Sequence, residues 1–318
     1  MTQSSTRHLI DPELLPMLDL LPSFEFTVEM LPMARESGGG RALNFPEPSI
    51  APKEFEIEGP EGKLLVLWFD PSPGESGRPA ILHMHGGGMV VGSARHMMNG
   101  PSALAKSLNV AVASVEYRLA PETPFPGPQE DCFAALEWLA GNASQLGVDP
   151  AHIAVHGDSA GGGLAAAVAQ MARDRGGPKL AAQILNCPML DYRVGGGDDP
   201  WRNRHTGEFV WSRVNNQFGW RSLRGGYKVD DDRKGWFSPS LAADLSGLPA
   251  AWIGVGTLDL FFDENLDYAR RLVDAGVSVE LHTYPGAFHG FSFMNQTGVA
   301  QRFERELIDG AARLLGRR

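Results

Sequence analysis

Short apolar runs alternate with longer amphipathic stretches over most of the chain. Eight runs predict β-strands because they are short, apolar and rich in β-branched residues, and they lie at 53–59, 63–69, 80–84, 110–115, 153–156, 181–186, 251–255 and 277–284. Apolar residues at roughly helical spacing predict helices near 95–107, 129–141, 160–174, 262–275 and 299–315. This alternation predicts an α/β fold with a mostly parallel eight-stranded sheet, flanked by helices and edged by an antiparallel hairpin of the first two strands.

Two regions lack this alternation. Residues 1–50 are rich in proline and leucine, and residues 190–240 contain four of the seven tryptophans, Trp201, Trp211, Trp220 and Trp236. We interpret both as additions packed over the sheet. The chain then divides into an N-terminal cap segment (1–50), a first part of the core (51–189), a cap insertion (190–240) and a second part of the core (241–318).

The net charge limits which binding partners we expect, and the cysteine content indicates the cellular compartment. A formal net charge of −10 argues against nucleic acid or an anionic membrane as partner. The N-terminus has no signal-peptide pattern, and no run approaches the ~18 apolar residues of a membrane span. The two cysteines, Cys132 and Cys187, fit a reducing compartment better than a disulfide framework. We therefore expect a cytoplasmic protein without a membrane span.

The stretch GDSAG (157–161) joins a predicted strand to a predicted helix and fits the G-x-S-x-G pattern of a nucleophile elbow. A sharp turn there strains the backbone of Ser159, and only very small residues fit at Gly157 and Gly161. The hydroxyl would then stand above the sheet at a helix N-terminus, where developing negative charge is favoured. We expect Asp158 to have a structural role. The alternative is a glycine-rich turn with an incidental serine.

A glycine run follows the third predicted strand in the segment HGGG (85–88). Glycine lets a chain curl so that backbone N–H groups point at an oxyanion, which acyl transfer generates. We assign this donation to the N–H groups of Gly87 and Gly88, with Ala160 as a third donor. Gly86 supports the loop, and we expect His85 to brace it through its ring nitrogens.

Other readings of this glycine run are weaker. A phosphate-binding loop would need Gly-Lys-Ser/Thr, and a dinucleotide-binding fingerprint would need a third glycine where Val91 stands. His83 and His85 could suggest a metal pair, but no clustered third ligand is evident nearby in the sequence. We therefore expect no metal and no organic cofactor.

A serine nucleophile needs a base and an acid that orients the base. Among nine histidines, His289 lies in the loop 284–291 after the last predicted strand, at the sheet edge where sites assemble. Asp259 comes first after the preceding strand, whereas Asp263 and Glu264 fall on a first helical turn that acids favour anyway. The predicted triad is Ser159, Asp259 and His289, in the chain order expected for this fold.

Taken together, these motifs resemble the bacterial hormone-sensitive-lipase branch (family IV) of the α/β-hydrolases. The resemblance covers most of residues 60–318 and rests on HGGG (85–88), EYRLAPE (116–122), GDSAG (157–161), DLFFDE (259–264) and FHGF (288–291), in the family's order. It implies an α/β-hydrolase fold with a helical cap, and the catalytic and oxyanion roles assigned above. The family usually has Asp-Pro-Leu where this chain has Asp-Leu-Phe at 259–261.

These inferences predict a serine carboxylesterase that hydrolyses short- to medium-chain esters through an acyl-enzyme. The expected partner is a small-molecule ester, and the resemblance allows a homodimer. One alternative is an amide, lactone or carbamate hydrolase on the same triad. A second alternative is a non-catalytic ligand receptor on a hydrolase scaffold, although such a protein should have lost part of the triad.

Overall fold

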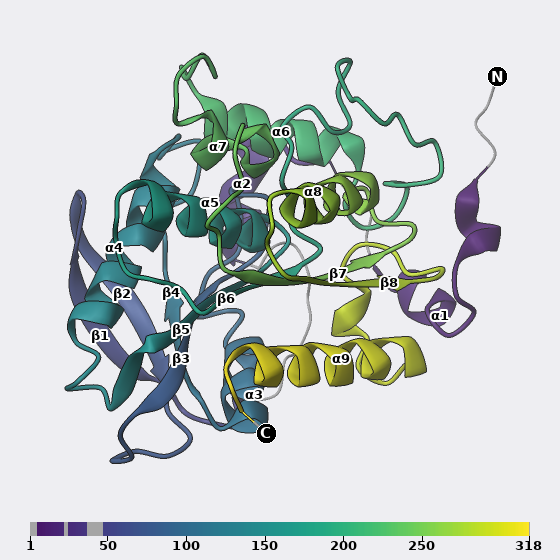
Figure 1. Cartoon of the computed structure of the whole chain (residues 1–318). Coiled ribbons are helices and arrows are strands. Elements are labelled where there is room, and N and C mark those ends of the chain that lie inside the picture. Colours follow the sequence, from purple (N-terminus) through teal and green to yellow (C-terminus); the bar gives the residue numbers. More distant parts are fainter. Residues whose placement is uncertain (1–4, 22–24, 37–46, 318) are drawn as a thin grey trace.

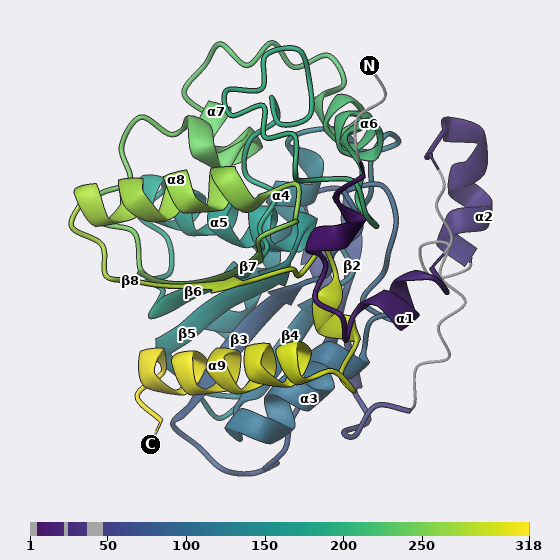
Figure 2. The same ribbon diagram turned by 90° about the vertical axis from the view of Figure 1, so that its right-hand side faces the viewer.

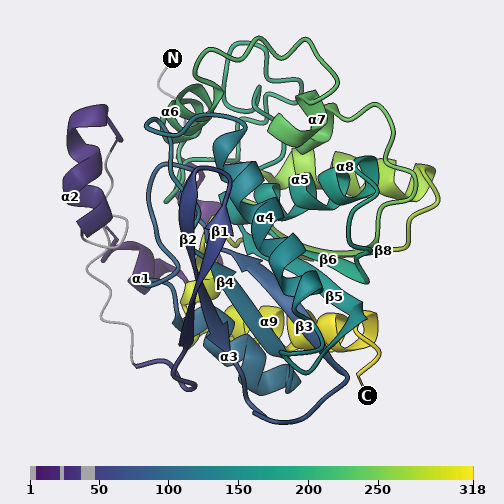
Figure 3. The same cartoon turned by 90° about the vertical axis from the view of Figure 1, so that its left-hand side faces the viewer.

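An eight-stranded sheet forms the centre of the computed structural model, which describes residues 5–21, 25–36 and 47–317 (Figure 1). Its strands are β1 (Lys53–Gly59), β2 (Gly62–Phe69), β3 (Arg78–Met84), β4 (Ala111–Val115), β5 (Val148–Asp158), β6 (Ala182–Asn186), β7 (Ala250–Gly256) and β8 (Val279–Tyr284), in the spatial order β1-β2-β4-β3-β5-β6-β7-β8. β1 and β2 form an antiparallel edge hairpin (Figure 3), β2 is antiparallel to β4, and all later neighbours are parallel. The predicted sheet and edge hairpin are confirmed.

Helices cover both faces of this sheet (Figure 2). α3 (Asn99–Leu108) and α9 (Gly298–Leu314) lie on one face, and α4 (Gly127–Gly141), α5 (Ala160–Asp174) and α8 (Phe262–Asp274) lie on the other. The N-terminal segment contributes η1 (Thr6–Leu9), α1 (Leu15–Leu18), η2 (Val28–Met30) and α2 (Leu31–Glu36), and η4 (Phe291–Phe293) precedes α9. Every residue of β3 and β4 is buried, which explains why both strands are mainly apolar in the sequence.

The insertion contains α6 (Arg213–Arg224), α7 (Lys234–Phe237) and η3 (Pro239–Leu241), and no strand in its described residues. α6 is a helix that the sequence analysis did not predict. Its start has a recognisable cap, because the Ser212 hydroxyl accepts a hydrogen bond from the Asn215 N–H at 3.2 Å. Its apolar side buries Trp220 and Leu223 against the core. Most other residues of this segment are polar, so its helical pattern is hard to recognise in the sequence.

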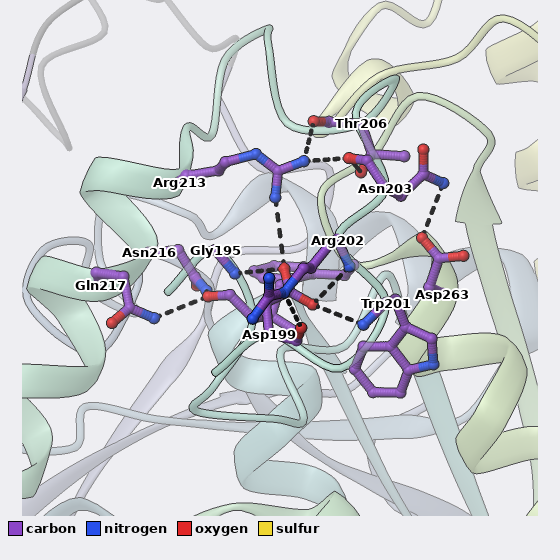
Figure 4. Close-up of polar contacts among 12 residues, drawn as sticks. Gly195, Asp199, Trp201, Arg202, Asn203, Thr206, Arg213, Asn216, Gln217 and Asp263 are labelled. Carbon is purple, nitrogen blue, oxygen red and sulfur yellow. Dashed lines mark hydrogen bonds and ion pairs between the residues drawn. The ribbon is translucent and has the colours of Figure 1, made fainter. Parts of the chain in front are cut away.

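Buried polar contacts hold the rest of the insertion in place (Figure 4). The Asp199 carboxylate accepts hydrogen bonds from the N–H groups of Gly195 at 2.9 Å and Trp201 at 3.0 Å, and lies 3.5 Å from an Arg213 nitrogen. Asn203 donates to Asp263 on α8 at 2.9 Å. Side chains that hydrogen-bond to its backbone therefore hold the insertion in place, and the contact of Asn203 with Asp263 attaches it to α8.

The ends of the insertion also join each other. The Ser238 hydroxyl donates to the Leu190 carbonyl at 2.8 Å and accepts from the Tyr192 N–H at 3.1 Å. The buried Glu264 carboxylate accepts the N–H groups of Leu190 at 3.0 Å and Asp191 at 2.7 Å. Burial and the neighbouring Asp191 raise the pKa of Glu264 well above its usual value. The insertion thus leaves and re-enters the core at one hydrogen-bonded junction.

Candidate active site

Ser159 lies between β5 and α5 with φ 57° and ψ −117°, a strained conformation for a residue with a side chain. The flanking glycines explain how the chain accommodates this turn. A Cβ at Gly157 would lie 2.1 Å from the Gly161 carbonyl oxygen, and one at Gly161 would lie 2.1 Å from the Met84 carbonyl oxygen. The glycine spacing therefore has a steric cause, which agrees with the predicted crowding around the serine.

The loop after β3 brings two glycine N–H groups to the same edge. Gly87 has φ 122° and Gly88 has φ 61°, so both adopt backbone conformations that favour glycine. Within the described part of the chain, neither N–H group has a hydrogen-bond acceptor. The Ala160 N–H belongs to the first turn of α5, where an intrahelical partner is lacking. All three N–H groups therefore lack an acceptor among the described residues.

His85 and Tyr117 shape this loop. His85 Nδ1 lies 2.8 Å from the Gly86 carbonyl, its ring stacks on Tyr117 at 4.2 Å, and the Tyr117 hydroxyl donates to the His85 carbonyl at 2.7 Å. Burial lowers the pKa of His85 to about 3, so the ring is neutral and donates through Nδ1. Among the residues that the structure describes, His85 Nε2 is buried without a hydrogen-bond partner, so one ring nitrogen braces the loop rather than both. The EYRLAPE motif thus contributes Tyr117 as the support of the glycine run.

Asp259 and His289 form a buried pair. Asp259 Oδ2 lies 2.8 Å from His289 Nδ1, and Asp259 Oδ1 accepts the Phe261 N–H at 2.9 Å. A carboxylate can only accept here, so Nδ1 carries the proton and Nε2 keeps a free lone pair. The Phe261 ring packs edge-on against His289 with centroids 5.2 Å apart. The phenylalanine that departs from the family's Asp-Pro-Leu pattern therefore helps to hold the imidazole.

One cavity brings these groups together. Its volume is about 100 Å³, and Gly86, Gly87, Ser159 and His289 line it. Apolar side chains make up much of the remaining wall, from Leu21, Phe26, Val91, Met97, Val210, Trp211 and Phe293, and the polar residues Asp158, Asn186, Asn215 and Ser292 also line it. Gly88 is not part of the wall because Trp211 packs over it, and a Cβ at Gly88 would lie 2.2 Å from the indole. The cavity therefore has a polar floor with the predicted reacting groups and a mostly apolar surround.

The other acids near the predicted triad have different contacts. Asp263 accepts a hydrogen bond from Asn203, and Glu264 anchors the insertion as described above. Asp158 accepts from Asn186 Nδ2 at 2.7 Å and lies 3.5 Å from His83 Nε2. Burial raises the pKa of Asp158, but the hydrogen bond with His83 and the charge of the nearby imidazoles lower it to about 2. None of the three carboxylates contacts His289 in the described structure.

The N-terminal segment and the insertion contribute unequally to the cavity wall. The insertion contains four tryptophans, and nothing in the sequence distinguishes them. Trp211 is the one that lines the cavity. Phe26 lines it as well, packs on Trp211 with centroids 6.0 Å apart, and donates its N–H to Asn215 at 2.9 Å.

Two residues near the cavity, Cys187 and Arg35, belong to no sequence motif, so the sequence alone does not indicate their positions. Cys187 lines the cavity with φ 36° and lies within 4.8 Å of ligand atoms of Asp259 and His289. Arg35 on α2 donates to the Val90 carbonyl at 2.9 Å and to the Ala120 carbonyl at 2.9 Å, which fastens the N-terminal segment beside the glycine loop. Both contacts depend on residues far apart in the chain.

Comparison with known proteins agrees with this geometry. A family model described as "alpha/beta hydrolase fold" matches residues 81–293. The carboxylesterase NlhH of Mycobacterium tuberculosis is 36% identical over 307 residues, which cover 89% of this chain and 88% of NlhH. Esterase LipI of the same organism is 31% identical over 307 residues, covering 89% of this chain and 88% of LipI.

Among solved structures, a bacterial heroin esterase superposes with a TM-score of 0.88 at 36% identity, covering 98% of this chain and 99% of that one. No helix in the described residues combines the length and the apolar character needed to cross a bilayer.

Proposed function

Because this chain belongs to the hormone-sensitive-lipase-like branch of the α/β-hydrolase family, we propose that it is a serine carboxylesterase with Ser159, His289 and Asp259 as its triad. The observation that carries the residue assignment is the 2.8 Å contact between Asp259 and His289, at the rim of a cavity that Ser159 also lines. Relatives named as esterases support the reaction class.

The proposed reaction is acyl transfer to water in two steps. His289 Nε2 takes the Ser159 proton as Oγ attacks the ester carbonyl, and the alkoxide leaves with that proton from the imidazolium. His289 then activates a water molecule, which releases the carboxylic acid and restores Ser159. Asp259 holds the tautomer of the imidazole and stabilises its charged form.

The N–H groups of Gly87, Gly88 and Ala160 would stabilise the oxyanion in both steps. Such preorganised donors cost no reorganisation when the charge develops, and each typically contributes ~10²–10³ in turnover. In this structure Gly87 lines the cavity, while Gly88 lies under Trp211. Gly86 supports the loop that carries two of these donors, and Gly157 and Gly161 allow the turn that positions the nucleophile.

The size of the cavity favours short- to medium-chain esters. A volume of about 100 Å³ holds on the order of seven to ten water-sized groups, since each needs roughly 10–15 Å³ of cavity volume. Its mostly apolar lining suits an alkyl chain rather than a charged substrate.

The N-terminal segment (1–50) and the insertion (190–240) form the cap of this proposal, over a core of residues 51–189 and 241–318. The contacts between Phe26, Trp211 and Asn215 support a joint cap, because they link the two segments directly over the cavity. A cytoplasmic location and a homodimer remain predictions from the sequence and the family resemblance.

A panel of p-nitrophenyl esters of rising acyl length tests the proposal. We expect turnover to be highest for short acyl groups and to fall as the chain outgrows the cavity. Mass spectrometry after rapid quenching should find the acyl group on the peptide that contains Ser159. An acyl group on another residue, or the absence of any hydrolysis, would contradict the assignment.

Matched ester, amide and lactone substrates separate the alternative chemistries on the same triad. The amide should react much more slowly, because its leaving group is poorer and nothing else in the described cavity is placed to assist it. Faster turnover of the amide than of the ester would favour the amidase alternative. Tight binding of all of them without turnover would favour a receptor.

A further inference from the structure

A second cavity adjoins the first on the α3 and α9 face of the sheet. Its volume is about 320 Å³, and it shares Met97, Asp158, Asn186, Ser292 and Phe293 with the first cavity. One wall is apolar and comes from α3 and α9: Pro101, Leu104, Phe303, Leu307 and Ile308. Its lining also includes two buried histidines and a carboxylate, His83, His156 and Asp158, which the proposed ester hydrolysis does not use.

The sheet register places these three side chains together. His83 on β3 is the direct partner of His156 on β5, so neighbouring parallel strands project them to the same face. Asp158 follows His156 by two residues and therefore projects to that face as well. The two imidazole centroids are 5.5 Å apart, and one ligand atom from each of the three residues lies within 4.8 Å of the others.

Second contacts fix the orientation of both imidazoles. His83 Nδ1 lies 2.9 Å from the Ser114 hydroxyl, and His156 Nδ1 lies 2.8 Å from the Ile184 carbonyl. A carbonyl only accepts, so His156 Nδ1 carries the proton and its Nε2 keeps a lone pair. Metal-binding histidines usually have this arrangement, in which the second ring nitrogen is held by an outer hydrogen bond.

The carboxylate is oriented in the same way. Asn186 Nδ2 donates to Asp158 Oδ1 at 2.7 Å, which leaves Oδ2 facing His83 Nε2 at 3.5 Å. Two ligands of a tetrahedral zinc ion at ~2.0–2.1 Å are ~3.3 Å apart, so this separation already suits a shared ion. The three donors thus need only small side-chain adjustments to converge.

We propose that His83, His156 and Asp158 form a binding site for a divalent transition-metal ion such as Zn²⁺. Two imidazoles and one carboxylate form a ligand set that suits Zn²⁺ and its neighbours. The ion replaces the hydrogen bond between His83 and Asp158, and its remaining coordination position opens onto the second cavity. Sequence analysis paired His83 with His85 and found no third ligand, because the other two ligands lie on β5, far along the chain.

Binding at this site should stabilise the fold. The ion would join the carboxyl ends of β3 and β5 beside the serine turn, and the unfolded chain does not hold the three ligands together. A ligand that binds only the folded state raises stability by mass action. We therefore expect Zn²⁺ to raise Tm in a saturable manner with one ion per chain.

Zinc titration of the metal-free Ser159→Ala protein tests the site independently of hydrolysis. Competition with a chromophoric chelator gives affinity and stoichiometry. His83→Gln and His156→Gln should each weaken binding by about tenfold or more, since even outer partners of metal ligands contribute ~10–100-fold. The exposed His152→Gln variant is the matched control and should bind like the parent. Equal affinity in all variants would refute the site and leave the cluster as a hydrogen-bonded support of the serine turn.

A second group of possible ligands, Cys187, Asp259 and His289, must be distinguished from this one. His289→Gln should leave zinc affinity unchanged if the proposal holds. The Co²⁺ form should lack the strong thiolate charge-transfer band that Cys187 would produce. Loss of binding in His289→Gln, or appearance of that band, would assign the ion to the triad instead.

If the histidine variants fail to fold, wild-type crystals soaked in Zn²⁺ decide the matter. Anomalous scattering at the zinc absorption edge should give one peak between His83 Nε2, His156 Nε2 and the Asp158 carboxylate. A peak elsewhere, or none at all, would overturn the proposal.

Discussion

The serine turn and the 190–240 insertion both line one cavity, but they are built by different means. The turn depends on backbone proximity, since Cβ atoms at Gly157 and Gly161 would lie 2.1 Å from carbonyl oxygens. The insertion depends on buried polar side chains that bind backbone N–H groups. Asp199 is one of them (Figure 4), and Glu264 of the core is another. The first kind of structure is specified by residue type at fixed spacing, and the second by pairs that are distant in the chain.

Removal of the nucleophile is the strongest test of the proposed triad. Ser159→Ala should lower turnover of p-nitrophenyl acetate by on the order of 10⁶, as in other triad enzymes, because the proposed acyl-enzyme forms on the Ser159 hydroxyl. Circular dichroism should be unchanged, since alanine is smaller than serine at the same turn. Activity near that of the wild type would exclude Ser159 as nucleophile.

Asp259 and Asp263 lie on the same short segment, but the first contacts His289 and the second contacts the insertion. Asp259→Asn should lower kcat by about 10⁴, since the amide favours the wrong imidazole tautomer. Asp263→Asn should have a far smaller effect, because Asp263 contacts Asn203 of the insertion rather than His289. A larger loss in Asp263→Asn would move the acid to that position and overturn the present choice.

Gly219 on α6 probes the contact between the insertion and the glycine loop. A Cβ there would lie 2.5 Å from the Gly88 carbonyl oxygen, so Gly219→Ala should displace the loop. We expect a fall in kcat of about 10–10², the order that a 1 Å misplacement produces. Alanine favours the helix itself, so a weaker α6 could not account for the loss. Gly226→Ala, with no neighbour within 4 Å, is the control and should behave like wild type. Equal kcat values in both variants would show that the loop tolerates the contact.

Asp199 tests whether the insertion depends on its polar network. Asp199→Ala removes the charged acceptor of the Gly195 and Trp201 N–H groups, so the free energy of unfolding should fall by about 1–3 kcal/mol, with little change in kcat for the folded enzyme. The neighbouring exposed Asp198→Ala should change it by less than about 0.5 kcal/mol. Urea unfolding followed by tryptophan fluorescence measures both. Indistinguishable midpoints would show that other contacts hold the insertion.

The sequence was sufficient for the sheet and for the segments that meet at its edge. Strand runs, the GDSAG turn and the loop with His289 each carry a local signal, so their placement followed from pattern and spacing. Strand ends were less certain: β5 runs from 148 to 158, although only 153–156 was predicted, because His152 and its neighbours look like a loop. α6 was missed altogether, since its stability comes from packing against distant residues.

Side-chain partnerships explain most of what the sequence left open. Choosing Trp211 among four tryptophans requires knowing that it lies over Gly88. The pairing of His83 with His156 requires the strand order, because β3 and β5 are neighbours in the sheet although β4 separates them in sequence. Neither fact has a local signature.

The junction at which the insertion leaves and re-enters the core bears on how such caps diversify. Leu190, Tyr192 and Ser238 tie the two ends together, and Glu264 secures the outgoing end from the core. If another loop replaced the residues between 193 and 237, the same hydrogen bonds would hold its two ends, and no strand of the sheet would be interrupted. The molecule therefore offers a defined splice point for exchanging substrate preference while its hydrolytic core is retained.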